Sequence, residues 1–404
     1  MIENNRFDLI VCGGGPSGVT AAIKAARQGV RTLLIERYGF CGGMATAALV
    51  NPFSGHEFTT ADGTKNGSLI GGLFKEIIQN LNYMGGYGSV LSPAAFDEEM
   101  LKLIYDQMLL KAGVQINYHS CIKSIKTENK EIKSVEVYSK EGVKEYFGKM
   151  FIDATGDGDI AAKAGLKFSI GRPEDGLTQA MTVSFRMANV DKADMIATGH
   201  IRKARALVEP YFQEALSNGT LIYPYRPFIH FYDYPREGVL HFNMTRINEV
   251  SGLSVNDLTK SEIEGRRQAY LIAEWLIKNV PYFKRSSIEK IACQVGVRET
   301  RHIKGLYIMT KDDIRNGTKF EDAIVRSRYF IDIHNPKGAH DVQQLKGKSG
   351  ALNHDFGPQP GDYYEVPYRS IVSSECDNLL IPCRALSATH EASAAIRVMA
   401  TMHG

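Results

Sequence analysis

"FDLIVCGGGPSGVTAA" (Phe7–Ala22) is an apolar run that opens directly into a turn of glycines. The apolar and β-branched residues Phe7–Cys12 predict a short, buried parallel strand. Pro16 suits the first position of a helix, and good helix formers follow as far as Gly29, where the pattern ends. The stretch therefore predicts a strand, a turn without side chains and a helix in immediate succession.

The glycine spacing in this turn is typical of a nucleotide-binding loop. Gly13 permits the tight turn, Gly15 lets a pyrophosphate approach the backbone, and Gly18 lets the helix pack closely on the strand. The helix N-terminus at Pro16 and Ser17 supplies free N–H groups and a partial positive charge for the phosphates. These residues are therefore predicted to bind a dinucleotide.

A second strand ends at an acidic residue, as a dinucleotide site requires. Val30–Ile35 is predicted as this strand, and Glu36 follows it, 23 residues after Gly13. An acid at this place accepts hydrogen bonds from the adenosine ribose hydroxyls. The unit predicts a Rossmann-like domain of the α/β class, but it does not distinguish NAD from FAD.

Length and composition restrict the class of protein. A chain of 404 residues exceeds the size of a single core, so two domains are expected. A net charge of +3 argues against nucleic acid and membrane partners, and no run of 18 apolar residues or signal peptide is seen, which favours a cytoplasmic location. Six scattered cysteines without a CxxC pair argue against disulfides, iron–sulfur clusters and any metal site.

A second turn without side chains follows the acid in "ERYGFCGGMAT". A glycine pair at this place resembles flavoproteins related to glutathione reductase, in which it lets the chain run along the extended FAD. The resemblance implies that FAD is the cofactor and that this turn binds it. The residues implied are Arg37, Gly42, Gly43, Met44, Ala45 and Thr46.

Three later segments carry the same resemblance: "MFIDATGDGDIAAKAG" from Met150, "VGVRETRHIKGLY" from Val295, and "NLLIPCRALSATHEASAAIRVMATM" from Asn378. The sequence resembles a member of the FAD-dependent oxidoreductase family in the glutathione-reductase-type flavoprotein superfamily, the group related to the flavin subunit of heterodisulfide reductase. Related proteins extend the last helix beyond the position of Gly404. The further cofactor residues that the resemblance implies are Ala154, Thr155, Gly156, Asp157, Arg384 and Ser387.

The rest of the pattern predicts how the two domains are built. A helix is predicted from Ser92–Pro93 to Gly113 and a third parallel strand at Gln115–Cys121, followed by a three-stranded antiparallel meander over 122–149. An FAD-binding domain of residues 1–165 and 361–404 is expected, with an inserted α+β substrate or cap domain of residues 166–360. In that insert, Ser261 and Glu264 predict a capping box at the start of a helix.

Few residues are candidates for catalysis. Arg298 and Arg301 follow the predicted strand Ile288–Val297, and their guanidinium groups suit a carboxylate, sugar hydroxyls or the charge of a reduced flavin. His390 opens the last helix, which in the family points its positive end at the flavin, so it is a candidate proton donor or acceptor. An internal Arg–Glu network and a purely packing histidine are the structural alternatives.

Three further residues are weaker candidates. His56 and His354 lie in predicted loops, where a histidine is more often only solvated, and 337–365 has the composition of a lid or active-site loop. Cys41 adjoins the glycine pair and is expected near the flavin, with an ordinary reduced thiol as the favoured interpretation.

Two classes of function stay open. The absence of a second GxGxxG and of a CxxxxC dithiol leaves a plan that resembles fumarate reductases and related dehydrogenases, in which hydride passes between flavin and a small polar organic substrate. The alternative is a flavin subunit that passes electrons to a partner protein, which the lack of iron–sulfur cysteines disfavours. A protein that binds FAD only weakly is a third class, and a homo-oligomer is compatible with each of them.

Overall fold

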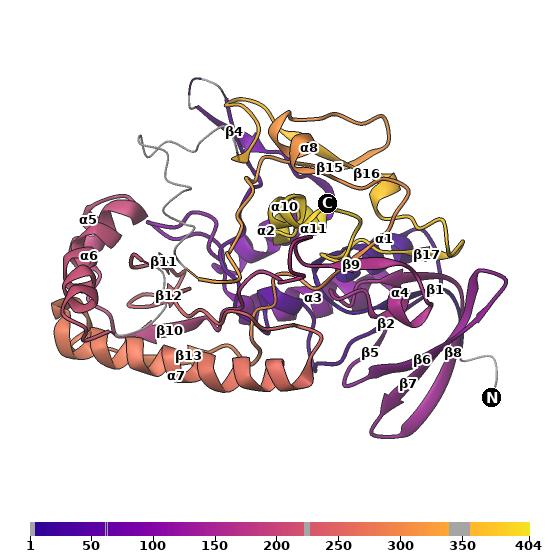
Figure 1. The fold of residues 1–404 in the computed structure, drawn as a ribbon, viewed down its shortest axis with the longest axis horizontal. Coiled ribbons are helices and arrows are strands. Elements are labelled where there is room, and N and C mark those ends of the chain that lie inside the picture. Colours follow the sequence, from indigo (N-terminus) through magenta and orange to yellow (C-terminus); the bar gives the residue numbers. More distant parts are fainter. Residues whose placement is uncertain (1–4, 61, 63, 222–226, 339–355) are drawn as a thin grey trace.

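The main sheet combines the N-terminal part of the chain with one strand from near its C-terminus (Figure 1). The computed structural model describes residues 5–60, 62, 64–221, 227–338 and 356–404. The sheet has the order β5-β2-β1-β8-β7-β6, and β17 pairs with β8. Its strands are β1 (Arg6–Cys12), β2 (Thr32–Ile35), β5 (Gln115–Asn117), β6 (Cys121–Glu128), β7 (Glu131–Ser139), β8 (Gly142–Asp153) and β17 (Leu379–Leu380).

The sheet confirms the predicted Rossmann-like architecture. β5, β2, β1, β8 and β17 pair in parallel, whereas β6, β7 and the first half of β8 form the antiparallel meander. The last strand of the meander and the strand before Ala154 are one continuous strand, since β8 pairs first with β7 and then with β1. β5 is shorter than predicted because Cys121 already belongs to β6.

Helices cover one face of this sheet, and the meander covers the other. Leu9 and Val11 of β1 pack with α1 (Pro16–Arg27), α2 (Gly72–Tyr83) and α3 (Glu98–Ala112). Ile10 and Cys12 point the opposite way and pack with apolar side chains of β7 and β8. This alternation fixes the register of β1, and the loop after it is thereby held at the edge of the sheet.

The predicted start of α3 is wrong and its end is confirmed. The helix begins at Glu98, because the carboxylate of Asp97 accepts the N–H of Glu99 at 2.9 Å and caps the first turn. Ser92 instead accepts a hydrogen bond from the N–H of Asp233 at 3.0 Å. Gly113 ends the helix in the left-handed conformation, with φ of 84°.

The helix predicted to begin at Ser261 also begins earlier. α7 (Val255–Asn279) is capped by Ser254, whose hydroxyl oxygen accepts the N–H of Asp257 at 3.2 Å. Ser261 lies inside the helix and donates to the Asp257 carbonyl, so the predicted capping box is wrong.

A second, antiparallel sheet has the order β11-β12-β10-β13. Its strands are β10 (Phe185–Ala188), β11 (Phe231–Asp233), β12 (Leu240–Phe242) and β13 (Ser287–Ile291). α6 (Ile201–Ser217) and α7 pack with it around a common core, which includes Phe185, Phe212 and Trp275. These elements fall within 166–360, although the domain boundaries themselves stay a prediction. β13 ends at Ile291, six residues before the predicted end at Val297.

The remaining elements are short and surround the two sheets. They are β3 (Glu57–Thr59) with β4 (Lys65–Ser68), α4 (Asp159–Lys163), β9 (Phe168–Ile170) with β14 (Arg301–Ile303), α5 (Ala193–Ala197), α8 (Lys311–Arg315), β15 (Ala323–Ser327) with β16 (Tyr364–Pro367), α10 (His390–Ile396) and α11 (Met399–His403). α11 contacts α1 and α2, so the C-terminal segment returns to the first helices of the chain (Figure 1).

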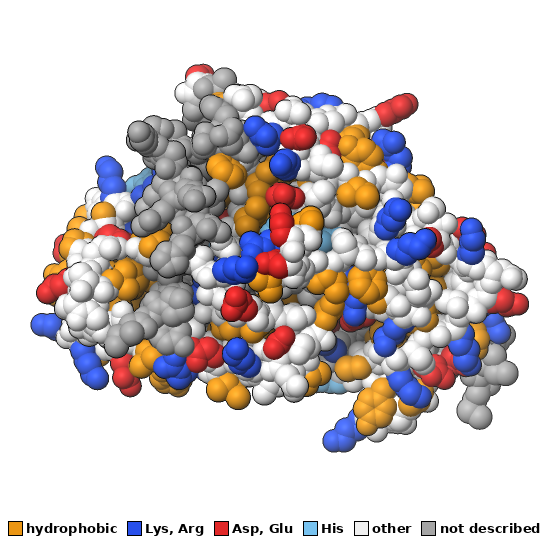
Figure 2. Space-filling view, in the orientation of Figure 1, with side chains coloured by type: hydrophobic (Ala, Val, Ile, Leu, Met, Phe, Trp, Pro, Cys, Tyr) orange, Lys and Arg blue, Asp and Glu red, His pale blue; other side chains and the backbone are white. Residues whose placement is uncertain are grey.

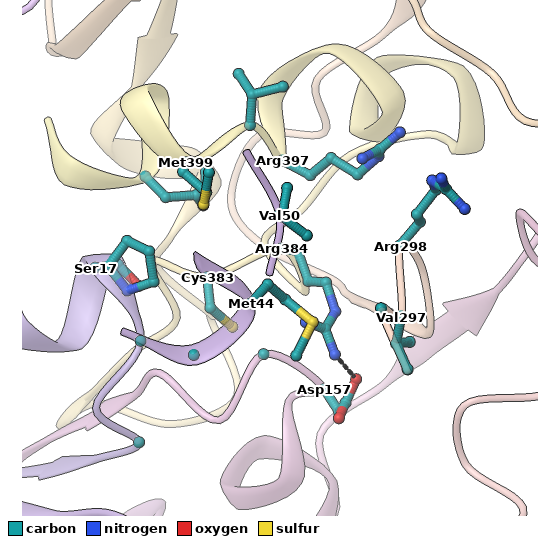
Figure 3. Close-up of a pocket in the computed structure, with 18 of the residues that line it drawn as sticks. Ser17, Met44, Val50, Asp157, Val297, Arg298, Cys383, Arg384, Arg397 and Met399 are labelled. Carbon is teal, nitrogen blue, oxygen red and sulfur yellow. Dashed lines mark hydrogen bonds and ion pairs between the residues drawn. The ribbon is translucent and has the colours of Figure 1, made fainter. Parts of the chain in front are cut away.

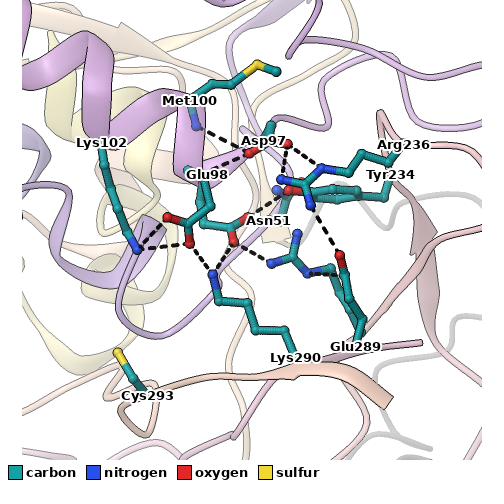
Figure 4. A network of polar contacts seen from close by, with 12 residues as sticks. Asn51, Asp97, Glu98, Met100, Lys102, Tyr234, Arg236, Glu289, Lys290 and Cys293 are labelled. Atoms are coloured by element: carbon teal, nitrogen blue, oxygen red, sulfur yellow. Dashed lines mark hydrogen bonds and ion pairs between the residues drawn. The ribbon is translucent and has the colours of Figure 1, made fainter. Parts of the chain in front are cut away.

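A cluster of ion pairs joins α3 to the second sheet (Figure 4). Glu98 is almost fully buried and pairs with Arg186 of β10 and Lys290 of β13. We call this cluster the Glu98 network; its members are Asp97, Glu98, Glu99, Lys102, Arg186, Tyr234, Arg236, Glu289 and Lys290. It fixes the position of the second sheet relative to the main one.

The surface carries charges of both signs. Figure 2 shows Lys and Arg side chains interspersed with Asp and Glu on the face drawn, with scattered apolar side chains between them. Within the described ranges, no helix is both long and apolar enough to cross a membrane.

Candidate functional site

A cavity of about 680 Å³ lies where the predicted cofactor residues converge (Figure 3). The loops after β1, β2 and β8 all open into it, at the carboxyl edge of the parallel strands, where α/β folds bind their ligands. The predicted cofactor residues that line it are Gly13, Gly15, Pro16, Ser17, Glu36, Arg37, Gly43, Met44, Ala154, Thr155, Gly156, Asp157 and Arg384.

The other predicted cofactor residues lie behind this wall and shape it. They are Gly18, Gly42, Ala45, Thr46 and Ser387. A Cβ atom at Gly18 would come within 2.0 Å of the Gly13 carbonyl oxygen, so this glycine permits the close packing of α1 on the turn. The hydroxyl of Thr46 donates to the Cys41 carbonyl at 2.9 Å and holds the second glycine turn in place.

The geometry of the first turn fits the diphosphate of a dinucleotide. Gly13 has φ of 104°, and a Cβ atom there would lie 2.3 Å from the Ala154 carbonyl oxygen, so only glycine fits. A Cβ atom at Gly15 would meet only that same oxygen, at 3.9 Å, which leaves open space above the backbone. Gly15 also caps α1 without a side-chain hydrogen bond, so the first N–H groups of the helix stay available for an anion.

Glu36 stands at the wall of the cavity, where the ribose of a dinucleotide is expected. Its carboxylate accepts the N–H groups of Gly14 at 2.6 Å and Tyr38 at 2.9 Å, which ties the end of β2 to the glycine loop. Burial raises the pKa of this carboxyl group, although both backbone hydrogen bonds lower it. The structure therefore holds Glu36, the acid predicted from the sequence, beside the glycine loop after β1.

Asp153 is a site residue that sequence reasoning missed. It is the last residue of β8, and its carboxylate accepts the hydroxyl of Thr155 at 2.7 Å and the N–H groups of Ile160 and Ala161 at 2.9 Å. Burial raises its pKa to about 6. The side chain fixes the whole 154–158 loop against the start of α4. The sequence signal that could have identified Asp153 was an acid at the end of an apolar strand.

Asp157 and Arg384 form an ion pair on the cavity wall (Figure 3). The hydroxyl of Thr300 also donates to Asp157, at 2.8 Å. Arg301 turns to the other side of this loop and donates to the Asp157 carbonyl at 2.8 Å and the Asp159 carboxylate at 2.9 Å. The structure thus brings Arg384 to the cavity, whereas the guanidinium of Arg301 joins β14 to the loop and does not line the cavity.

His390 belongs to a buried cluster outside the cavity lining. Its Nδ1 lies 2.7 Å from the Glu299 carboxylate, and Nε2 of His302 lies 2.8 Å from the same oxygen. Burial alone would raise the pKa of Glu299, but the two histidines lower it to about 2. Thr389 caps α10, since its hydroxyl oxygen accepts the N–H of Ala392 at 3.4 Å. The role of His390 in proton transfer stays a prediction, and its contacts resemble the structural alternative.

Neither Cys41 nor His56 lines the cavity. Cys41 is buried behind it, and burial raises the pKa of its thiol far above the usual range, which disfavours a reactive thiolate. His56 is buried against Phe74 and lies 3.2 Å from the Tyr87 hydroxyl. His354, with most of the predicted loop 337–365, lies outside the described residues.

The far end of the cavity reaches the second sheet and is polar. Arg298 lines it as predicted, but most of its other side chains were missed by sequence reasoning: Thr182, Ser184, His230, Tyr232, Asn243, Tyr329, Asp332, His334 and Arg397. They come from segments far apart in the chain, so no local pattern groups them. Arg397 alone carried a signal, as a single charge within the apolar stretch "SAAIRVMATM".

A Rossmann-like sheet with this loop, acid and cavity defines a dinucleotide-binding protein. A protein-family model described as "FAD dependent oxidoreductase" matches residues 8–404, nearly the whole chain. The chain therefore belongs to this family of oxidoreductases, and FAD is its cofactor. The side-chain-free turn and the uncapped helix start are features that fit FAD.

Similarities to individual proteins are partial. A digeranylgeranylglycerophospholipid reductase of Thermoplasma volcanium is 28% identical over 199 residues, which cover 46% of this chain and 48% of the relative. The corresponding reductase of Thermoplasma acidophilum is 28% identical over 196 residues. The chain spans about half the length of these relatives. Dihydrolipoyl dehydrogenase of Trypanosoma brucei brucei is 51% identical over 39 residues, 10% of this chain and 8% of the relative.

Likeness to solved structures is also partial. A geranylgeranyl bacteriochlorophyll reductase-like protein of Thermoplasma acidophilum has a TM-score of 0.42 and 18% identity, with 73% of this chain and 67% of that chain covered. A myxobacterial chondrochloren halogenase has a TM-score of 0.45 and 13% identity, with 75% and 66% covered. Membership of the family rests on the family model and not on these likenesses.

Proposed function

We propose that the protein transfers a hydride between FAD and a small polar organic substrate. One observation carries this proposal: the cavity continues without a break from the glycine loops to the polar side chains of the second sheet. FAD supplies the redox chemistry when bound, and the protein supplies binding and orientation. A cofactor end and a polar end in one cavity are what a flavin enzyme with an organic substrate needs.

The residues of this chain divide into two groups under the proposal. The start of α1 and Glu36 hold the cofactor, and Asp153 fixes the loop that borders it. At the other end, Ser184, Tyr232 and Asn243 present hydroxyl and amide groups to a substrate. We accordingly assign residues 1–165 and 361–404 to cofactor binding and residues 166–360 to substrate binding. Within the second range, the segment at Arg298 lies between the two ends of the cavity.

Of the three residues predicted to be catalytic, Arg298 has the best support because it lines the cavity. For Arg301 and His390 we propose positioning roles, since each binds protein groups outside the cavity. The kinship with the flavin subunit of heterodisulfide reductase, and a function as an electron-transfer subunit, stay predictions without a supporting contact. The same is true of a cytoplasmic location and a homo-oligomer.

Hydride transfer is tested with the holoprotein under anaerobic conditions. Hydroxy acids, sugars and enoates are mixed in turn with the oxidised or the photoreduced protein, and flavin absorbance is followed. We expect at least one hydroxylated compound to bleach the flavin, or one enoate to reoxidise it, within the time of a turnover. A flavin that responds to none of them but exchanges electrons readily with artificial carriers would contradict the proposal.

Glu36→Ala tests the cofactor end independently. Each hydrogen bond from a ribose hydroxyl to a charged acceptor contributes about 1.5–3 kcal/mol, so most of the FAD should be lost on purification while circular dichroism stays unchanged. The matched control is Glu237→Ala, which removes an exposed carboxylate from the turn before β12. Equal FAD content in the two variants would contradict the assignment of Glu36 to ribose binding.

A further inference from the structure

One buried carboxylate joins three segments that lie far apart in the chain. The side chain of Glu299 is 0% exposed, and its Oε1 lies 2.7 Å from Nδ1 of His390 and 2.8 Å from Nε2 of His302. Its other oxygen, Oε2, accepts the backbone N–H of Gln179 at 2.9 Å. We call these four residues the Glu299 cluster.

The carboxylate is the acceptor in all three contacts. Burial would raise the pKa of Glu299, but the two histidines lower it to about 2, so the group carries no proton near neutral pH. Nδ1 of His390 and Nε2 of His302 therefore each donate a hydrogen bond to the same oxygen. These hydrogen bonds fix the orientation of both imidazole rings.

The Glu299 cluster holds both ends of α10. His390 is the first residue of this helix, and Arg397 caps its end. Nη2 of Arg397 donates to the side-chain oxygen of Gln179 at 3.3 Å, and the backbone N–H of the same Gln179 binds Glu299. A helix of seven residues is only about 10 Å long, so one cluster reaches both of its ends.

The segment that follows α10 forms a wall of the cavity. Arg397, Val398, Met399 and Met402 all line it, and we call them the C-terminal wall. α11 contacts α1, and Figure 3 shows Met399 on the same side of the cavity as Ser17 at the start of α1. The C-terminal wall therefore borders the space beside the glycine loop, where the cofactor is expected.

α10 does not need an ionised group for its stability. Ala392 and Ile396 pack in an apolar core with Ile314 of α8 and Val366 of β16, and Thr389 caps the first turn. A buried ionised group adds little net stability compared with apolar packing, because taking its charge out of water is costly. What the carboxylate adds is a single geometry, since hydrogen bonds are directional and apolar contacts are not.

We propose that Glu299 is a positioning residue for FAD binding, which acts through His390 and Gln179 to hold α10 and, with it, the C-terminal wall. His302 binds the same oxygen, but it belongs to β14 and not to the helix that carries the wall. The proposal goes beyond hydride transfer and does not depend on the substrate, because only FAD has to be bound.

The two histidines provide the test, because they are matched in burial and in distance to the same oxygen. Their side chains are 5% exposed for His390 and 3% exposed for His302. His390→Leu removes the contact at the start of α10, and Glu299→Leu removes all three contacts. Both should raise the Kd of FAD at least tenfold and change the visible circular dichroism of the bound flavin.

His302→Leu is the matched control. It should leave the Kd of FAD within a factor of two and the circular dichroism unchanged, even where its Tm falls as far as that of His390→Leu. Release of FAD from the diluted holoprotein, followed by flavin fluorescence, gives the Kd of each variant.

A conservative variant separates the hydrogen bond from the imidazole ring. The amide nitrogen of asparagine stands close to the place of Nδ1 of a histidine, so His390→Asn keeps a donor for Glu299. It should restore the Kd of FAD to within threefold of the wild type. If a leucine at either position prevents folding, His390→Ser and His302→Ser provide the same matched comparison with a smaller side chain.

Three outcomes would overturn the proposal. Equal weakening of FAD binding by the substitutions at His390 and His302 would show that the cluster acts on the fold alone. An unchanged Kd in Glu299→Leu, or no gain of His390→Asn over His390→Leu, would contradict it as well. No substrate is needed for these measurements, so they are independent of hydride transfer, whose failure would appear as a flavin that no organic compound oxidises or reduces.

Discussion

The Glu98 network and the half-buried Arg397 both hold a guanidinium group inside the molecule, yet the groups that accept its hydrogen bonds differ in charge. In the network, Arg186 has a side chain only 1% exposed and lies against Glu98, whose side chain is 2% exposed. Four carboxylates face four cations there: Asp97, Glu98, Glu99 and Glu289 against Lys102, Arg186, Arg236 and Lys290.

Arg397 has no carboxylate partner among the described residues. The hydrogen bonds of Arg397 go to the side-chain oxygen of Gln179 at 3.3 Å and the backbone carbonyl of Asp332 at 3.2 Å, and both of these acceptors are neutral. Burial alone therefore does not distinguish a structural arginine from a binding arginine. The charge of its acceptors is a second criterion, because removing one partner of a buried ion pair leaves an uncompensated charge, whereas removing an arginine that donates to neutral oxygens does not.

The largest effect is expected for Glu98→Gln. The substitution leaves Arg186 and Lys290 without their shared carboxylate in a buried place, and breaking a buried pair in this way costs about 3–5 kcal/mol. Thermal unfolding of the holoprotein should show a drop of several degrees in Tm. As a control, Glu274→Gln removes a carboxylate from the exposed pair with Lys278 and should leave Tm unchanged. Equal Tm values for the two variants would remove the basis of the comparison.

Acid should weaken the same network together with His241 of β12, which lies opposite Arg186 of β10 in the second sheet. Burial and the charge of Arg186 lower the pKa of His241 to about 3, and the pKa of Glu98 lies at about 2, where the attraction of Arg186 and Lys290 outweighs the opposing effect of burial. The unfolded chain takes up these protons near pH 6.5 and 4.5, and the folded chain only near 3 and 2. The free energy of unfolding therefore falls as the pH drops from 6.5 towards 2.

His241→Gln isolates the upper part of that window. Between pH 6.5 and 4.5 the variant should lose stability less steeply than the wild type, by up to about 1.4 kcal/mol per pH unit. Denaturant midpoints at half-unit intervals measure the two slopes. Other buried histidines contribute equally to both proteins, so parallel slopes would mean that His241 does not titrate as its burial implies.

Local sequence pattern was sufficient to predict the elements that form within a single segment of the chain. The glycine loop, α1, β2 with Glu36 and the meander were all predicted, because spacing and alternation along one stretch determine them. The start of α3 failed because Asp97 is a stronger cap than the Ser92–Pro93 signal suggested. Contacts between distant segments could not be predicted from local sequence pattern. Glu98 contacts Arg186 and Arg397 contacts Gln179, at separations of 88 and 218 residues along the chain.

The same limit divides the predicted site. The cofactor residues follow strands, and parallel strands end at one edge, so most of them reached the cavity. Arg298, Arg301 and His390 were placed near the flavin by the same reasoning, but only Arg298 lines the cavity. Which way a side chain turns at such an edge depends on partners such as Glu299 and Asp159, which the spacing along the chain does not reveal.

The smallest effect on stability is expected for Arg397→Gln. Like Glu98→Gln it replaces a charged group by an amide, but Arg397 is only half-buried, and the lost hydrogen bonds, at 3.3 and 3.2 Å, are long and end on neutral oxygens. The free energy of unfolding should therefore change by less than about 1 kcal/mol, with FAD content retained. Tm and flavin absorbance of the purified variant measure both quantities. A loss as large as that of Glu98→Gln would show that Arg397 holds the fold together, and the difference between the two clusters would then be one of degree only.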